Sequence, residues 1–192
     1  MRTIRVVVIA SLAWFAVPGA WPGAAAQPQG RDGQGAAAAH VFAERIDRYD
    51  RLRARFEEPL PSFEARRDAW SRLLTRRYLA SAIRTARAHA QPGAVFGPPV
   101  DAFLRAIIAD ASSEIPVDGL DGLADDAEGA VDLVVNEPVP EWALRVVPAV
   151  LLERLPALPP GIGYRVAGGA LLLWDEHAEI LIDALPGAFV RE

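Results

Sequence analysis

The chain of 192 residues contains no cysteine and no lysine. The lack of cysteine excludes disulfides, thiolate metal sites, a cysteine nucleophile and a lipoprotein modified at a cysteine. The lack of lysine excludes a Ser-x-x-Lys motif, and no serine lies in Gly-x-Ser-x-Gly, so serine-hydrolase chemistry is disfavoured. Without covalent cross-links, the fold must be held together by its apolar core.

Histidine is scarce as well, with only His40, His89 and His177 in the whole chain. None of them has a second histidine four residues away, so the zinc motif H-E-x-x-H does not occur. All twenty basic residues are arginine, and 25 acidic residues outnumber them to give a net charge of −5. Because no basic patch is interleaved with aromatic residues, we expect no nucleic-acid partner.

The first 26 residues have the order of a secretory signal peptide. Arg2 and Arg5 form the positive start, a largely apolar run covers residues 6–17, and the small residues Ala24-Ala25-Ala26 offer a cleavage site. The apolar run is short of the roughly 20 residues that a membrane-spanning helix needs. We therefore predict cleavage near Ala26, a periplasmic or secreted protein, and no transmembrane span in the mature chain.

The mature chain, about 165 residues long, can form one domain with a real core. Residues 27–36 are rich in Gly and Gln and are expected to form a disordered leader. The domain then covers residues 37–192, with a helical part at 37–113, an acidic loop at 114–129 and a β-rich part at 130–192.

Helical spacing of apolar residues predicts three amphipathic helices, at about 37–57, 62–90 and 100–113, with Ser62 as the N-cap of the second. The apolar stripe of the first helix includes Phe42, Ile46, Tyr49 and Phe56. If that helix projects from the domain, the stripe is exposed, and an apolar patch of that size marks an interface with a partner. These four residues are the candidate partner-binding site.

The end of the chain is the most β-like segment. Residues 164–167, 170–174 and 179–183 predict three strands joined by a Gly168-Gly169 turn and by a polar turn at 175–177. A short strand at 130–135 and a short helix at about 148–155 are expected before them. Strands this apolar must pack against something, and the helices are the expected cover.

Helices and strands are segregated along the chain, which predicts an α+β fold. In it, N-terminal amphipathic helices are followed by a short strand, a short helix and a C-terminal three-stranded antiparallel meander. Charge divides in the same way: residues 31–105 hold fourteen arginines against nine acids, and residues 106–192 hold four against sixteen. Either the two halves attract each other within one domain, or the arginine-bearing helices meet an anionic surface such as lipid headgroups or a partner protein.

Two groups of residues are candidate metal ligands. The first is Asp118, Asp121, Asp125 and Asp126, whose carboxylates lie in a glycine-containing loop of the kind that calcium prefers. Their spacing does not fit the EF-hand pattern, because Leu120 and Gly122 occupy ligand positions counted from Asp118. An ordinary solvated loop is the favoured interpretation.

The second group is Asp175, Glu176 and His177, three potential ligands or acid–base groups in one hairpin turn. Adjacent residues of a strand alternate between faces, so the three converge only if the turn wraps them inward. A polar turn that faces water is favoured over a metal site, and no cofactor is predicted.

The aromatic residues allow two interpretations, an apolar binding groove or ordinary core packing, of which core packing is favoured. They are Trp70, Trp142, Trp174, Tyr49, Tyr78 and Tyr164.

Short motifs near the C-terminus carry a resemblance to known sequences. They are Leu155-Pro156-x-Leu158-Pro159, Tyr164-Arg165, Gly168, Leu171-x-Leu173-x-Asp175 and Ile180-x-Ile182-Asp183. With the segment from Ile83 to Arg105, these motifs resemble a group of exported bacterial proteins of unknown function. The meander is also similar to small periplasmic proteins of nickel and cobalt homeostasis. The resemblance implies export and the order of helices followed by a meander, and it implies no reaction, ligand or catalytic residue.

The sequence thus predicts an exported, non-enzymatic binding or interaction module of the periplasm or cell envelope. Two alternatives stay open. One is a small hydrolase-like enzyme that uses the Asp/Glu/His group at residues 175–177. The other is a carrier of a metal or small ligand, with the acidic loop as its site.

Overall fold

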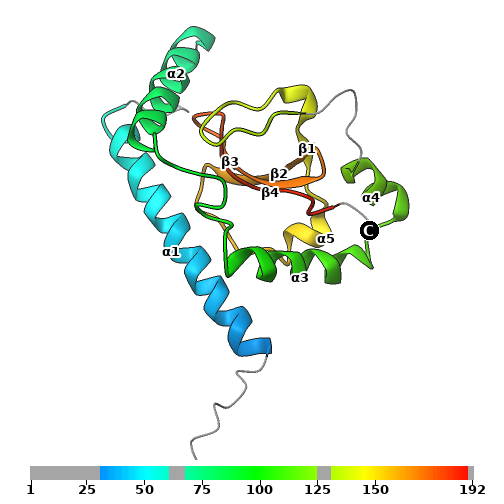
Figure 1. The fold of residues 1–192 in the computed structure, drawn as a ribbon. Helices are drawn as coiled ribbons and strands as arrows, with labels where there is room; N and C mark the ends of the chain where they lie inside the picture. Colours follow the sequence, from blue (N-terminus) through cyan, green and yellow to red (C-terminus); the bar gives the residue numbers. More distant parts are fainter. Residues whose placement is uncertain (1–30, 61–67, 125–130, 190–192) are drawn as a thin grey trace, which may run out of the picture.

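The computed structural model describes residues 31–60, 68–124 and 131–189, and it has the expected α+β architecture. Helices come first along the chain and an antiparallel sheet comes last (Figure 1). The helices are α1 (Arg31–Glu57), α2 (Ala69–Ala86), α3 (Val100–Ser112), α4 (Val117–Ala124) and α5 (Ala149–Leu152). The strands are β1 (Arg145–Val146), β2 (Ile162–Ala167), β3 (Ala170–Asp175) and β4 (Ile180–Leu185), and a 3-10 turn at Glu141–Ala143 precedes β1.

The sheet confirms the predicted meander and adds one strand to it. Its order is β1-β2-β3-β4, and every neighbouring pair is antiparallel. The turn between β2 and β3 is Gly168-Gly169, with φ of 54° and 67°. Positive φ at both positions is typical of the tight hairpin turn that matches strand twist, which explains the two glycines.

Both faces of the sheet are covered. On one face, Leu171 and Leu173 of β3 join the main core with residues of α1, α2, α3 and α5. On the other, Leu172 and Trp174 pack with Val139 and Ala143 in a second cluster. Figure 1 shows the segment that leads from residue 131 to β1 lying over this second face, opposite α3 and α5. Every residue of β3 is buried as a result.

This covering segment corrects the prediction of a strand at 130–135. Its described residues, from Val131 on, form no strand, and the additional strand is β1 instead. Val131 and Leu133 pack on the second cluster. Alternating apolar residues here cover the face of a sheet rather than extend its edge, a distinction that the local pattern does not contain.

The helix boundaries differ from the predictions where tertiary contacts intervene. Helix α1 begins at Arg31, inside the expected leader, and an added Cβ on Gly35 would lie 3.9 Å from the Phe103 side chain of α3. The glycine-rich composition here disfavours a helix, and packing against α3 stabilises it. Helix α2 is shorter than expected and is capped by Asp68, whose carboxylate accepts a hydrogen bond from the Ser71 N–H. The expected cap, Ser62, lies outside the described residues.

The expected loop at 114–129 contains a helix instead, α4. Val117, Leu120 and Leu123 recur every three residues after Pro116, which is a helix-starting pattern. Leu123 is buried in the main core. The acids and glycines between these positions obscured the helical period in the sequence.

Candidate functional site

The predicted partner-binding stripe on α1 is part of the core, not an exposed surface. Phe42, Ile46 and Tyr49 are buried, with 1%, 2% and 5% of their surface exposed, and Phe56 is half-buried against the same cluster. Phe42 stacks on Phe96, with ring centroids 6.2 Å apart. Helix α1 therefore packs on the domain, and its stripe offers no docking surface in this structure.

The hairpin turn at 175–177 does not bring its three side chains together. Asp175 is fully buried and accepts hydrogen bonds from the Tyr49 hydroxyl, at 2.6 Å, and from the N–H groups of His177 and Ala178. Glu176 pairs with Arg165 on the neighbouring strand, at 2.9 Å. This turn is therefore not simply a polar turn facing water, because its first residue anchors the sheet to α1.

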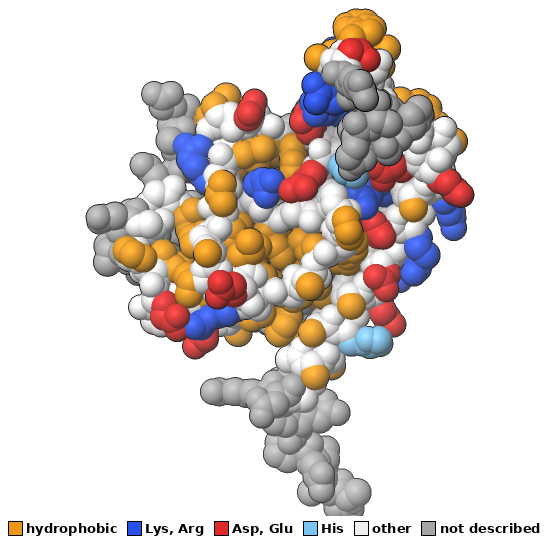
Figure 2. Space-filling view, turned by 180° about the vertical axis from the view of Figure 1, so that it is seen from behind, with side chains coloured by type: hydrophobic (Ala, Val, Ile, Leu, Met, Phe, Trp, Pro, Cys, Tyr) orange, Lys and Arg blue, Asp and Glu red, His pale blue; other side chains and the backbone are white. Residues whose placement is uncertain are grey.

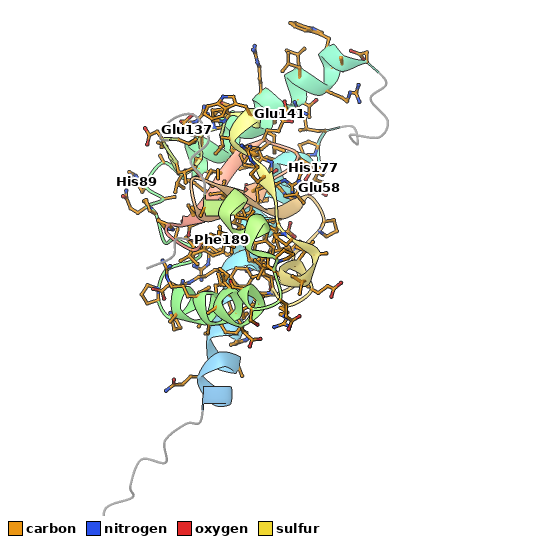
Figure 3. The ribbon with its side chains drawn as sticks, turned by 90° about the vertical axis from the view of Figure 1, so that its right-hand side faces the viewer. Glu58, His89, Glu137, Glu141, His177 and Phe189 are labelled. Atoms are coloured by element: carbon orange, nitrogen blue, oxygen red, sulfur yellow. The ribbon has the colours of Figure 1, made fainter. Side chains whose placement is uncertain are left out.

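His177 turns to α1, where its Nδ1 contacts the Glu57 carboxylate. Figure 3 labels His177 and also Glu58, the residue that follows Glu57 at the C-terminal end of α1. Nowhere in the described ranges do three or more His, Cys, Asp or Glu side chains gather in a way that could hold a metal ion. Of the other candidates, Asp118 and Asp121 lie on α4, and Asp125 and Asp126 lie outside the described residues.

A second buried carboxylate, Asp183, was not singled out from the sequence. It accepts hydrogen bonds from the backbone N–H groups of Gly93, Val95 and Phe96 at 2.7–2.8 Å, and from Ala184 at 2.9 Å. A β-bulge at Ile182 shifts the register, so that Asp183 pairs with Leu173. Asp183 thereby holds the segment between α2 and α3 against the sheet.

Arg87, the residue that caps α2, is the cation that interacts electrostatically with both of these carboxylates, without forming an ion pair with either. Its guanidinium donates to the Asn136 Oδ1, at 2.6 Å, and to the Ile182 carbonyl, and it lies 5.0 Å from the centre of the Tyr49 ring. Burial lowers the pKa of Arg87, and both Asp183 and Asp175 oppose that effect. Burial, reinforced by Asp175, raises the pKa of Tyr49 well above its usual range, so Tyr49 stays a hydrogen-bond donor.

Beside Arg87 lies a hollow of about 510 Å³, which we call the arginine pocket. It is lined by Arg45, Arg48, Tyr49, Arg51, Leu52 and Arg55 of α1, and by Arg87, Ala90, Ala94 and Val95 after α2. Five of these ten side chains are arginines and none is acidic. Its size is within the usual range for small-ligand sites.

The five arginines have two different roles. Arg45 donates to the carbonyls of Val95, Gly97 and Pro98 at 2.7–2.8 Å, and so, like Arg87, it builds the wall. Within the described part of the chain, the side chains of Arg48, Arg51 and Arg55 form no hydrogen bond or ion pair. These three exposed guanidinium groups bring positive charge to the pocket and are not paired by any described residue.

A second hollow of about 470 Å³, near β1 and α5, provides a contrast. Its lining is mainly apolar and contains a single arginine, Arg165, which is already paired with Glu176. An excess of unpaired positive charge therefore distinguishes the arginine pocket from the other described hollow.

From the sequence, these arginines were considered only as part of a positively charged helical half that meets either the acidic half or an anionic surface, and no pocket was predicted. Their signal was the spacing: Arg48, Arg51 and Arg55 recur at three and four residues, which places them along one side of a helix. What the spacing could not show is that the segment at 90–95 faces that side and closes a hollow.

Comparisons with known protein families, characterised proteins and solved structures find no match to this chain. Among the described helices, none is long and apolar enough to cross a membrane.

Proposed function

We propose that this protein is an exported binding module of the periplasm or cell envelope, and that its ligand is an anion held in the arginine pocket. The signal-like first 26 residues support the location. The observation that carries the binding proposal is the lining of the pocket, with five arginines, no acid, and three guanidinium groups without a described partner.

The chemistry of the lining defines the class of ligand. Guanidinium groups bind carboxylate and phosphate through paired, charge-assisted hydrogen bonds. Between the arginines, Leu52, Ala90, Ala94 and Val95 present apolar surface. A carboxylate or phosphate that carries a short apolar chain matches both parts of this lining.

Calorimetric titration of the chain from Gln27 to Glu192, which contains every described element, tests this proposal. Octanoate and octyl phosphate serve as probes, with 1-octanol as the uncharged analogue. We expect the double variant Arg48→Gln/Arg51→Gln to weaken binding of both anions at least tenfold, because a hydrogen bond to a charged group contributes about 1.5–3 kcal/mol.

The matched control is Arg72→Gln/Arg77→Gln, which removes two exposed arginines of α2 that do not line the pocket. This control should bind octanoate as the parent chain does. Equal binding by both double variants, or equal binding of 1-octanol and octanoate, would contradict a site that recognises the anion.

A further inference from the structure

Helix α2 is apolar on two opposite sides. Leu79 and Ile83 are fully buried in the main core. Trp70, Leu74 and Tyr78 are exposed, by 64%, 48% and 50% of their surface. At about 100° per residue, this second set lies on the side of the helix that faces away from the core. The expectation of core packing was wrong for Trp70, Tyr78 and Trp142, and it is confirmed for Tyr49, Tyr164 and Trp174.

The exposed set, which we call the α2 stripe (Trp70, Leu74 and Tyr78), is continuous. Residues four apart are neighbours on a helix surface, so the three form a row about 12 Å long. The end of α2 that begins at Ala69 stands clear of the sheet (Figure 1), and hydrophobic side chains gather at this outer end (Figure 2). A contiguous apolar row that faces solvent usually marks a contact surface.

The charge of α2 has a single sign. The helix holds four arginines and no acid. Arg76 pairs with Glu179 and Arg84 with Glu137, at 2.8 and 2.9 Å. Arg72 and Arg77 are exposed and form no direct ion pair with any residue that the structure describes. The Ser71 N–H, and after it Arg72, lowers the pKa of the capping Asp68. Two exposed positive charges therefore accompany the exposed apolar row.

We propose that the α2 stripe docks onto an anionic lipid surface. The rings of Trp70 and Tyr78 are of the kind that prefers the boundary between headgroups and acyl chains. Arg72 and Arg77 bind the lipid phosphates beside them. The helix lies on the bilayer and does not cross it, in agreement with its modest length and hydropathy.

Charge favours lipid over a second copy of the same chain. In a two-fold symmetric dimer through this surface, the same arginines of both copies would approach one another. An anionic bilayer instead offers uniform negative charge to a helix that has no acid of its own. The docking surface does not overlap the arginine pocket, since the two share no lining residue.

Co-sedimentation with vesicles tests the proposal, using the chain from Gln27 to Glu192. Vesicles of phosphatidylglycerol and phosphatidylcholine in equal parts are compared with vesicles of phosphatidylcholine alone. We expect binding to the anionic vesicles only. The variant Trp70→Ser/Leu74→Ser/Tyr78→Ser should lose at least tenfold in affinity, and Arg72→Gln/Arg77→Gln about fivefold for each arginine removed.

Two controls separate this surface from others. Trp142→Ser removes an exposed tryptophan elsewhere, and Arg48→Gln/Arg51→Gln removes charge at the pocket, and both should bind vesicles as the parent does. Retained vesicle binding by the folded triple variant, or no vesicle binding by the parent, would overturn the proposal. So would a dimer of the parent chain that the triple variant abolishes while vesicle binding is absent. None of these outcomes bears on octanoate binding in the pocket.

Discussion

At the scale of single residues, two buried aspartates decide how the helical half meets the sheet. Asp183 and Asp175 are both fully buried, and each accepts hydrogen bonds both from neighbouring residues and from a group far away in the sequence. A carboxylate that accepts hydrogen bonds from several N–H or O–H groups has its hydrogen-bonding capacity satisfied and can stay buried. Each therefore acts as a polar anchor between two distant segments.

The hydrogen bonds of Asp183 predict a large effect on stability. Asp183→Ala leaves the N–H groups of Gly93, Val95 and Phe96 without their acceptor, and an unsatisfied buried donor costs about 1–3 kcal/mol. We expect the free energy of unfolding in urea to fall by at least about 3 kcal/mol. Asp132→Ala, at an exposed aspartate, is the control. A loss below 1 kcal/mol for Asp183→Ala would show that water or backbone movement replaces the carboxylate.

The raised pKa of Tyr49 predicts how stability depends on alkaline pH. Burial raises the pKa of both Tyr49 and Tyr164 above the unfolded value of about 10. Above that pH the unfolded chain loses phenol protons that the folded chain keeps, so stability is full below pH 10 and falls as the pH rises. Each tyrosine contributes a slope of about 1.4 kcal/mol per pH unit.

The variants Tyr49→Phe and Tyr164→Phe separate the two contributions. Urea unfolding followed between about pH 10 and 11.5 should show about half the parent slope in either variant. Tyr49→Phe should also lower stability at neutral pH, because Asp175 loses the hydroxyl donor at 2.6 Å. An unchanged alkaline slope in Tyr49→Phe would mean that its phenol ionises as easily in the folded chain as in the unfolded one.

At the scale of elements, local signals were sufficient where the conformation is set by a few neighbouring residues. The Gly168-Gly169 turn, the three apolar strands around it and α3 were predicted to within a few residues. Helix α4 and the first turns of α1 were missed, since glycines and acids weaken their local helical preference. The first turns of α1 lie against α3, where an added Cβ on Gly35 would meet Phe103, a residue distant in the sequence.

The turn between β2 and β3 gives a test at this scale. Gly168 is exposed and has φ of 54°. A substitution there therefore changes the conformational energy of the backbone and has little effect on packing. Gly168→Val should destabilise the protein by about 1–2 kcal/mol, because a β-branched residue disfavours left-handed φ. Gly168→Asn should be nearly neutral, because asparagine tolerates this conformation. Thermal unfolding of both variants tests this expectation. Equal losses of stability in Gly168→Val and Gly168→Asn would contradict it.

At the scale of the whole molecule, the structure shows the first of the two consequences considered for the uneven charge, attraction between the two halves, and our proposals concern the second. Arg76 and Arg84 of α2 form ion pairs with Glu179 and Glu137 of the acidic half. These pairs connect the two halves within one domain. The arginines that remain without a described partner lie at two places, the arginine pocket and beside the α2 stripe. Our two proposals assign an anionic ligand to the first and an anionic lipid surface to the second.

These two assignments make opposite predictions for the same pair of double variants. Arg48→Gln/Arg51→Gln should lose octanoate binding and keep vesicle binding. Arg72→Gln/Arg77→Gln should lose vesicle binding and keep octanoate binding. Each variant is thus the control for the other, with equal changes in net charge. A loss of both activities in both variants would indicate a general effect of positive charge rather than two sites.

The sequence alone determined the α+β class, the C-terminal meander and the division of charge, because these depend on periodicity, turn residues and composition. Only the tertiary structure decided which faces are covered. The stripe on α1 became core because α3 and the segment at 93–97 pack on it, and the stripe on α2 stayed exposed because the described fold provides no cover for that side. Both stripes show similar helical spacing, so burial depended on long-range packing that no local pattern contains.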